Sequence, residues 1–467
     1  MTLSIKSIGG TINEEPKIRN LRQEGKVDSD CFTLKYVAED FENTILRHYI
    51  YLNGKRIEIT KAVGYESANN EFTYTVKNLT IATKYKVQIE VTDGLDTVRS
   101  DVVTMSTSEI QIYGVRVDQS NSNPETCVKY IEQAVGLTPA KNGNLNSWKD
   151  RWPFNKVRLV GFKGGKVTKE INPMDKTKYV DGTTVPRDVD VMSEIPKIYW
   201  KVYESGNSYE IRIANSKVDS GYEALGHTVK DVEKDFIYVG AYLGYVQSGK
   251  MRSISGVRPK GDLSLNDAKN YSKNVGSGYL THNWYVLKVL QICYLIAYKS
   301  LDSQTALGRG FTGGSGVTNT GGTNKKGLFY GSTNAKEQVC FMGIEDFFGN
   351  MEQWIAGIYL DNSYGLMATP DNYTFDRYSF ECIGPQSQIN DPGYMGYANA
   401  TEKGLFFPST GGSETTHYCD YIVVLENYFP VFGGYYASQY NAGAFAFQAH
   451  WRETDTNGIF GGRLVYI

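Results

Sequence analysis

The sequence lacks the cysteine and histidine patterns of metal sites and disulfide frameworks. Its six cysteines are scattered over 467 residues with no C-x-x-C pair, which excludes the usual zinc spacings. Five of them are flanked by apolar or aromatic residues, a context that indicates buried free thiols and folding in a reducing cytoplasm. The five histidines show no metal-ligand spacing either. We therefore predict no metal and no cofactor.

Charge of one sign and long hydrophobic runs are also scarce. The formal net charge is −2, so there is no basic excess that would draw the chain to nucleic acid or anionic lipid. The N-terminal "MTLSIKSIGG" has neither the basic region nor the apolar core of a signal peptide. The most apolar helical stretch, Trp284–Tyr298, is too short to span a bilayer and predicts a buried helix. We expect a protein made in a cytoplasm, without membrane insertion.

Tyrosine and glycine are abundant, with 35 Tyr and 48 Gly against 13 Pro. This composition is typical of a β-rich protein with long ordered loops. It is also typical of recognition surfaces, because Tyr supplies a large contact area at little cost in rotamer entropy. The length of 467 residues exceeds that of one ordinary domain, so two or three units are expected.

Residues 1–108 predict an antiparallel sandwich of short strands. The alternation in "YKVQIEV", Tyr85–Val91, predicts a half-buried strand, and Asn53-Gly54 predicts a two-residue hairpin turn. The segment "VKNLTIATKYKVQIEVTDG" resembles the end of a fibronectin type III or related immunoglobulin-like module. The resemblance implies that residues 1–108 serve as a spacer or docking unit.

From residue 109 the pattern changes to a mixture of helices and strands. Residues 124–136 predict a helix, Ser264–Gly276 a helix capped at Ser264 or Asn266, and residues 282–308 a longer helix. A β segment is expected at about residues 150–235. The Gly-rich residues 307–334 lack the phosphate-loop pattern and predict a long irregular loop.

The most specific stretch is "MGIEDFFGNMEQWIAGI", Met342–Ile358, which predicts a helix, a turn and a strand. It resembles the D-x-x-G-N-V-W-E-W motif of formylglycine-generating enzymes and of the C-type-lectin-fold proteins related to them. The chain also ends with a Gly-Gly pair and a Gly-Arg step that resemble that family's R-G-G-S-W … G-F-R ending. The matching residues are Asp346, Gly349, Asn350, Trp354, Gly433, Gly434, Gly462 and Arg463.

The same ending is found in the variable proteins of diversity-generating retroelements, many of which are phage tail-fibre receptor binders. Shorter patches with the same likeness span residues 110–467. The resemblance implies an α+β chain, with an immunoglobulin/fibronectin III-like sandwich over 1–108. It implies a large C-type-lectin-like domain over 109–467, closed by a variable-type binding segment over 433–467.

The catalytic and metal ligands of these families do not carry over. Formylglycine-generating enzymes bind copper through two cysteines in their C-terminal segment, whereas the last cysteine here is Cys419. His417 and His450 could still meet in space. The calcium triplets of animal C-type lectins are absent, and the nearest fragments, "TPDN" (369–372) and "INDPG" (389–393), predict turns. We predict no catalytic residue.

The terminal segment then becomes a candidate binding face. Strand alternation in "AGAFAFQAHW" leaves open whether Phe447 faces the core. In the resembling proteins, exposed and diversified side chains follow the Gly-Gly pair, while small residues pack inward. The resemblance implies ligand-binding roles for Tyr435, Tyr436, Ser438, Gln439, Tyr440, Phe445, Gln448, His450, Trp451 and Arg452.

The sequence thus favours a non-enzymatic receptor-binding protein of a phage or prophage tail fibre or related particle. The resemblance implies a bacterial surface protein or polysaccharide as receptor, other virion proteins as partners of the N-terminal module, and a homotrimer. Two alternatives stay open. One is a diverged formylglycine-generating-type oxidase, and the other is a structural fibre or baseplate component.

Overall fold

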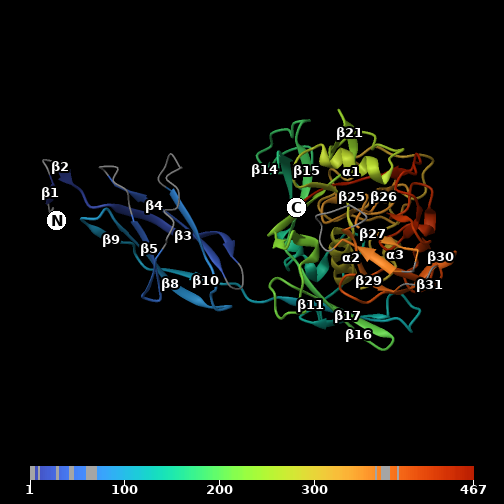
Figure 1. Cartoon of the computed structure of the whole chain (residues 1–467), viewed down its shortest axis with the longest axis horizontal. Coiled ribbons are helices and arrows are strands. Elements are labelled where there is room, and N and C mark those ends of the chain that lie inside the picture. Colours follow the sequence, from blue (N-terminus) through green and yellow to red (C-terminus); the bar gives the residue numbers. More distant parts are fainter. Residues whose placement is uncertain are drawn as a thin grey trace. The chain divides into compact units, whose positions relative to one another are not determined.

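The computed structural model describes residues 6–8, 11–27, 31–40, 47–58, 71–362, 365–369, 379–385 and 389–467. The chain separates into two compact units, Met1–Gln111 and Ile112–Ile467 (Figure 1). The sequence predicts a domain boundary between residues 108 and 109.

The N-terminal unit is built of antiparallel strands. The Asn53-Gly54 hairpin is confirmed, since both residues have positive φ (50° and 82°) and Leu52 pairs with Lys55 across the turn. One sheet has the order β10-β8-β5-β6 with β9 beside β8, a second the order β3-β4-β7, and β1 pairs with β2. The strands are β1 (Lys6–Ile8), β2 (Thr11–Asn13), β3 (Lys17–Val27), β4 (Phe32–Glu39), β5 (Arg47–Leu52), β6 (Lys55–Glu58), β7 (Glu71–Val76), β8 (Lys84–Thr92), β9 (Thr97–Arg99) and β10 (Val103–Ser106).

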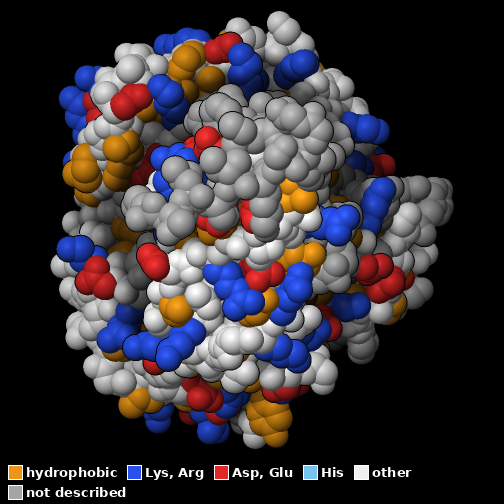
Figure 2. All heavy atoms as spheres, turned by 90° about the vertical axis from the view of Figure 1, so that its left-hand side faces the viewer, with side chains coloured by type: hydrophobic (Ala, Val, Ile, Leu, Met, Phe, Trp, Pro, Cys, Tyr) orange, Lys and Arg blue, Asp and Glu red, His pale blue; other side chains and the backbone are white. Residues whose placement is uncertain are grey.

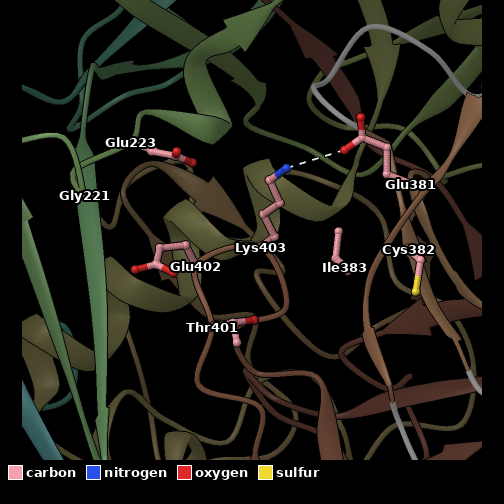
Figure 3. Close-up of a pocket in the computed structure, with 8 residues that line it drawn as sticks. All are labelled: Gly221, Glu223, Glu381, Cys382, Ile383, Thr401, Glu402 and Lys403. Carbon is pink, nitrogen blue, oxygen red and sulfur yellow. Dashed lines mark ion pairs between the residues drawn. The ribbon is translucent and has the colours of Figure 1, made fainter.

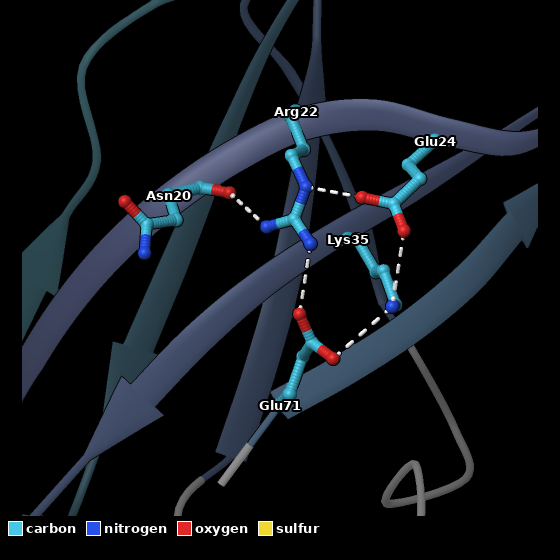
Figure 4. Close-up of polar contacts among 5 residues, drawn as sticks. All are labelled: Asn20, Arg22, Glu24, Lys35 and Glu71. Carbon is cyan, nitrogen blue, oxygen red and sulfur yellow. Dashed lines mark hydrogen bonds and ion pairs between the residues drawn. The ribbon is translucent and has the colours of Figure 1, made fainter. Parts of the chain in front are cut away.

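The core of this unit lies between the inner faces of β4, β5 and β8. Alternate residues of β8 are buried, which confirms the half-buried strand predicted from the alternation. On the β3-β4-β7 sheet, Arg22 and Lys35 share the carboxylates of Glu24 and Glu71 (Figure 4). Exposed pairs of this kind contribute little to stability. The assignment to an immunoglobulin-like family is not confirmed.

The expected α+β class is wrong, because the chain is mostly β. The described residues of the C-terminal unit contain three α-helices, α1 (Leu265–Lys273), α2 (Trp284–Tyr298) and α3 (Ser303–Ala306). Short 3-10 turns lie at Asn146–Trp148, Phe154–Lys156, Leu225–His227 and Gln439–Asn441.

Two predicted helices are strands instead. Residues 124–136 contain β12 (Val128–Glu132), which pairs antiparallel with β11 (Ile112–Asp118). The stretch Met342–Ile358 begins in a β-hairpin, formed by β24 (Cys340–Phe341) and β25 (Ile344–Glu345), and continues into β26 (Glu352–Trp354). In both places pairing with a neighbouring strand overrides a local pattern that fits a helix.

The two best-defined predicted helices are confirmed. Ser264 caps α1 and forms a reciprocal capping box with Asp267. Helix α2 has the predicted bounds, and all of its residues are buried. Lys288 lies inside this helix, where its ammonium group contacts the ring of Trp284 at 3.5 Å and donates a hydrogen bond to Gln291 Oε1 at 2.6 Å. Burial lowers the pKa of Lys288 well below its usual value.

Three large sheets surround α2 in the C-terminal unit (Figure 1). Their orders are β12-β11-β17-β16, β14-β13-β15-β20-β36-β23 and β31-β30-β32-β34-β33-β26-β35, and a smaller sheet has the order β27-β28-β29. The apolar residues Ile422, Val423 and Val424 lie buried in β32. The remaining strands are β13 (Arg158–Lys163), β14 (Lys166–Glu170), β15 (Asp190–Pro196), β16 (Tyr199–Ser205), β17 (Ser208–Ala214), β18 (Thr228–Val229), β19 (Val232–Glu233), β20 (Phe236–Gly240), β21 (Tyr245–Gln247), β22 (Lys250–Arg252), β23 (Tyr279–Thr281), β27 (Ile358–Leu360), β28 (Gly365–Ala368), β29 (Glu381–Pro385), β30 (Ile389–Ala398), β31 (Pro408–Gly412), β32 (Tyr421–Val424), β33 (Phe429–Phe432), β34 (Phe447–Trp451), β35 (Phe460–Gly461) and β36 (Leu464–Tyr466).

Two general properties of the described residues are the hydropathy of the helices and the distribution of surface charge. No helix among the described residues is long and apolar enough to cross a membrane. On the face shown in Figure 2, basic and acidic side chains are interspersed. This mixture agrees with the net charge of −2.

Candidate functional site

The motif residues of Met342–Ile358 and of the chain's end meet in one buried polar network. Asn350 donates a hydrogen bond from Nδ2 to Asp346 Oδ2 at 2.8 Å. Its Oδ1 accepts one from the backbone N–H of Thr318 at 2.9 Å. Asp346 and Asn350 both have 0% exposure, so neither can contact a ligand. Burial and the neighbouring Glu345 carboxyl raise the pKa of Asp346 above its usual range.

Arg463 is the centre of this network. Its guanidinium donates to the backbone oxygens of Gly240, Glu345 and Asp346, each at 2.8 Å, and its Nε donates to Gln353 Oε1 at 2.7 Å. Burial lowers the pKa of Arg463 to about 10, which still leaves the group charged at neutral pH. One side chain therefore ties β36 to the motif and to β20.

The motif glycines bring the backbone of the terminal segment close to this network. The N–H of Gly349 donates to the carbonyl of Gly433 at 3.0 Å. Gly434 has φ of 74°, and a Cβ there would lie 2.7 Å from the Cβ of Ala442. Trp354 is fully buried and donates from Nε1 to the carbonyl of Leu263 at 2.7 Å. Gly462 is also buried, so the motif residues are structural in this protein.

Phe445 is a correction to the predicted binding face. Its side chain is 2% exposed, and its ring packs against those of Tyr418 and Phe406, each with centroids 5.1 Å apart. Its N–H donates to Asp420 Oδ2 at 2.6 Å. Phe445 is buried because the backbone of residues 444–445 is bonded to Asp420 and to α2. Gln291 of α2 donates a hydrogen bond to the carbonyl of Ala444 at 2.7 Å.

Phe447, whose direction the sequence left open, also faces the core. It is 3% exposed and packs against Trp284 and Phe407. The binding face therefore excludes both phenylalanines of "AGAFAF".

The residues Tyr435–Tyr440 form an exposed turn with a fixed backbone. Tyr436 donates from its N–H to the carbonyl of Asn350 at 3.1 Å, and its own carbonyl accepts from Gly314 at 2.6 Å. The N–H of Gln439 donates to the carbonyl of Thr312 at 2.9 Å. Tyr440 is 51% exposed. The other predicted residues of the turn keep part or all of their side chains accessible; these are Tyr435, Tyr436, Ser438 and Gln439.

The other four predicted residues lie in different surroundings, on or just after β34. Gln448 donates from Nε2 to Glu352 Oε1 at 2.6 Å. Trp451 is half-buried and packs against Phe460, with ring centroids 4.9 Å apart, and against His450, at 4.3 Å. Arg452 is exposed. The sequence predicts one binding face for these residues and the tyrosine turn, but different segments hold the two groups. Asn350 and the loop 307–334 hold the turn, whereas β34 contacts β26 and β35.

Two residues beside the tyrosine turn were missed by the sequence. The guanidinium carbon of Arg309 lies 4.2 Å from the ring centre of Tyr440. Tyr394 donates from its hydroxyl to Asn441 Oδ1 at 2.7 Å. We call Arg309, Tyr394, Tyr435, Tyr436 and Tyr440 the tyrosine surface. No local pattern could have found Arg309, because it sits in the Gly-rich loop, far from the turn in sequence.

Two well-formed hollows lie elsewhere on the described part of the chain. One, of about 450 Å³, is lined by Glu223, Glu402 and Lys403, with Lys403 paired to Glu381 at 3.5 Å and the thiol of Cys382 at its edge (Figure 3). The other, of about 360 Å³, lies between Arg187 and Asn324. Neither is lined by a residue of 433–452.

The described residues contain no group of three His, Cys, Asp or Glu side chains placed to hold a metal ion. His417 packs against Tyr397 with the two rings tilted and their centroids 5.7 Å apart, whereas His450 packs on Trp451. The fragment "TPDN" lies largely outside the described residues, as do the side chains at the start of "INDPG".

Comparison with known proteins gives only distant likenesses. No protein-family model and no curated protein matches the chain. Solved structures that are similar include the M1 variant of Major Tropism Determinant, at 11% identity and a TM-score of 0.27 over 95% of this chain and 82% of that one. The P3c variant matches at 10% identity and 0.23 over 99% and 89%, and the U1 variant at 11% and 0.22 over 96% and 82%. Scores at this level do not establish a shared fold.

Proposed function

We propose that this chain is a non-enzymatic receptor-binding protein of a phage tail fibre or related particle. It recognises a bacterial surface through the tyrosine surface. The observation that carries the proposal is the turn Tyr435–Tyr440, which exposes aromatic side chains on a backbone fixed to a buried network. Tyrosines on a rigid frame are suited to recognition, because little side-chain entropy is lost when they bind.

The buried motif residues give a second argument for the proposal. Buried hydrogen bonds join segments that are far apart in sequence, and they are formed by Asp346, Asn350 and Arg463. Such a frame tolerates changes of the side chains it presents, as a binding face that must adapt to different receptors requires. The resemblance of these motifs to variable proteins of diversity-generating retroelements agrees with this role. By the same resemblance, the N-terminal unit joins other virion proteins and the chain forms a homotrimer.

The test is attachment of the purified full chain to a panel of intact bacterial strains. Wild-type protein should attach to a subset of strains. Tyr435→Ala and Tyr440→Ala should each weaken attachment by roughly tenfold or more, since aromatic anchors commonly contribute more than 1.4 kcal/mol.

Tyr203→Ala is the matched control, because Tyr203 is also exposed (58%) but lies on β16. It should attach like wild type. If the Tyr435 and Tyr440 variants attach as well as this control, the surface is wrongly placed. If wild-type protein attaches to no strain, the function itself is wrong.

A further inference from the structure

Arg309 is a cation whose charge is not matched by any carboxylate among the residues that the structure describes. Its Nε donates to the neutral Gln304 Oε1 at 3.3 Å, and its guanidinium lies over the ring of Tyr440. Among the described residues no carboxylate forms an ion pair with it. The side chain is only half exposed, so its charge has lost part of its hydration without gaining an anionic partner.

The position of Arg309 is fixed by the same groups that fix the tyrosine turn. Gln304 donates from Nε2 to the carbonyls of Gln439 (2.9 Å) and Ala442 (2.6 Å), while its Oε1 accepts from Arg309. The backbone N–H of Arg309 donates to the carbonyl of Ser332 at 2.8 Å. A guanidinium held in this way loses little further entropy when its other N–H groups bind a partner.

We propose that Arg309 and Tyr440 together form an anchor for a carboxylate of a protein receptor, an Asp or Glu side chain that docks beside the ring of Tyr440. The inference rests on the proposed function and adds to it the chemistry of the receptor. A guanidinium fork matches a carboxylate with two parallel hydrogen bonds. The Tyr440 ring shields that pair from water, which strengthens it.

A protein receptor fits these side chains better than a polysaccharide does. Tyr and Arg are the residues that most often dominate the affinity of protein–protein interfaces. Neither of the two hollows described above is lined by a residue of the tyrosine turn. One acidic side chain of the receptor then neutralises the charge of Arg309.

The first measurement is attachment of wild type, Arg309→Gln and Arg309→Lys to cells of a strain that wild type binds, over a series of salt concentrations. Arg309→Gln should bind at least about tenfold more weakly and with a flatter salt dependence, because one charge pair is lost. Arg309→Lys should keep the salt dependence but lose part of the affinity, because it keeps the charge without the fork.

Arg187→Gln is the matched control. Arg187 is exposed, forms no ion pair among the described residues and lies at the rim of the 360 Å³ hollow. This variant should attach like wild type. Thermal unfolding of each variant verifies that the fold is intact.

The second measurement uses the same cells after treatment with protease or with periodate, which oxidises sugars. Loss of wild-type attachment after protease, and its survival after periodate, are expected. The reverse pattern would show an acidic polysaccharide as the ligand and would overturn the protein receptor.

The two proposals fail in different ways. Equal affinity and salt dependence for wild type and Arg309→Gln, with attachment still lost in Tyr435→Ala, would refute the carboxylate anchor and leave the function standing. Absence of wild-type attachment would refute both.

Discussion

At the scale of the residue, Arg463 joins segments that are hundreds of positions apart. It serves four acceptors at once, three of them backbone oxygens. Only a planar group with five donors can do this, which explains why the position requires arginine. Removing any of these bonds leaves buried acceptors without a donor.

We predict that Arg463→Lys lowers the free energy of unfolding by about 3 kcal/mol, since Lys keeps the charge but cannot reach all four acceptors. Denaturant-induced unfolding of the full chain measures the difference. Arg258→Lys, at an exposed position, is the control and should change little. An equally small effect at Arg463 would mean that water replaces the missing bonds.

Gly443 shows a limit of reasoning from sequence at single residues. The sequence grouped it with small residues that pack inward, and it is buried. The close approach of Asp420, 2.0 Å from where a Cβ would lie, depends on a strand that is distant in sequence. The burial of Phe445 has the same origin. The alternation of apolar residues in this segment predicts a strand. The contact of Asp420 with Gly443 and Phe445 explains why that strand, β34, begins only at Phe447.

At the scale of the element, β26 and β34 lie on either side of β33 in one sheet, and β26 carries a carboxyl group that bonds to β34. Glu352 is 2% exposed and accepts a hydrogen bond from Gln448. Burial raises its pKa to about 8, so the folded protein holds this proton more tightly than the unfolded chain does. The stability that this proton supplies is present below the unfolded pKa, about 4.5, and is lost as the pH rises toward 8.

We predict that Glu352→Gln removes this pH dependence, because the amide resembles the protonated acid. Between pH 5 and 8 the unfolding free energy of wild type should fall by up to about 1.4 kcal/mol per pH unit more than that of the variant. Denaturation at several pH values gives both curves. Other buried acids are common to both proteins and cancel. Parallel curves would show that Glu352 is ionised in the folded state.

Elements with strong local signals could be predicted, whereas strands whose pattern also fits a helix could not. Helices α1 and α2 have a cap or a long apolar run, and both were found with nearly correct bounds. The stretches that contain β12 and β25 favour a helix in the sequence, because their hydrophobic spacing fits either structure. Only their partners decide between the two. The α+β class failed for this reason.

At the scale of the whole molecule, each of the two units has its own apolar core. The core of the first includes Phe32, Leu34 and Ile89, and the main core of the second surrounds α2 and includes Phe341. Units with separate cores commonly unfold as separate cooperative transitions.

We predict two heat-absorption transitions in calorimetry of the full chain. Phe32→Ala should lower the midpoint of one transition and Phe341→Ala that of the other, since each substitution leaves a cavity worth about 3–5 kcal/mol in its own core. Each variant is the control for the other. A single transition that both variants shift equally would show that the units unfold together.

The placement of β36 has a consequence for how the protein is made. This strand pairs with β20 on one side and β23 on the other, so residues 464–466 fill the middle of a sheet whose other strands were synthesised far earlier. Until those residues leave the ribosome, β20 and β23 have open edges, which are prone to pair with other chains. We therefore expect the nascent C-terminal unit to depend on chaperones until translation has passed residue 466, and the folded unit to appear only afterwards.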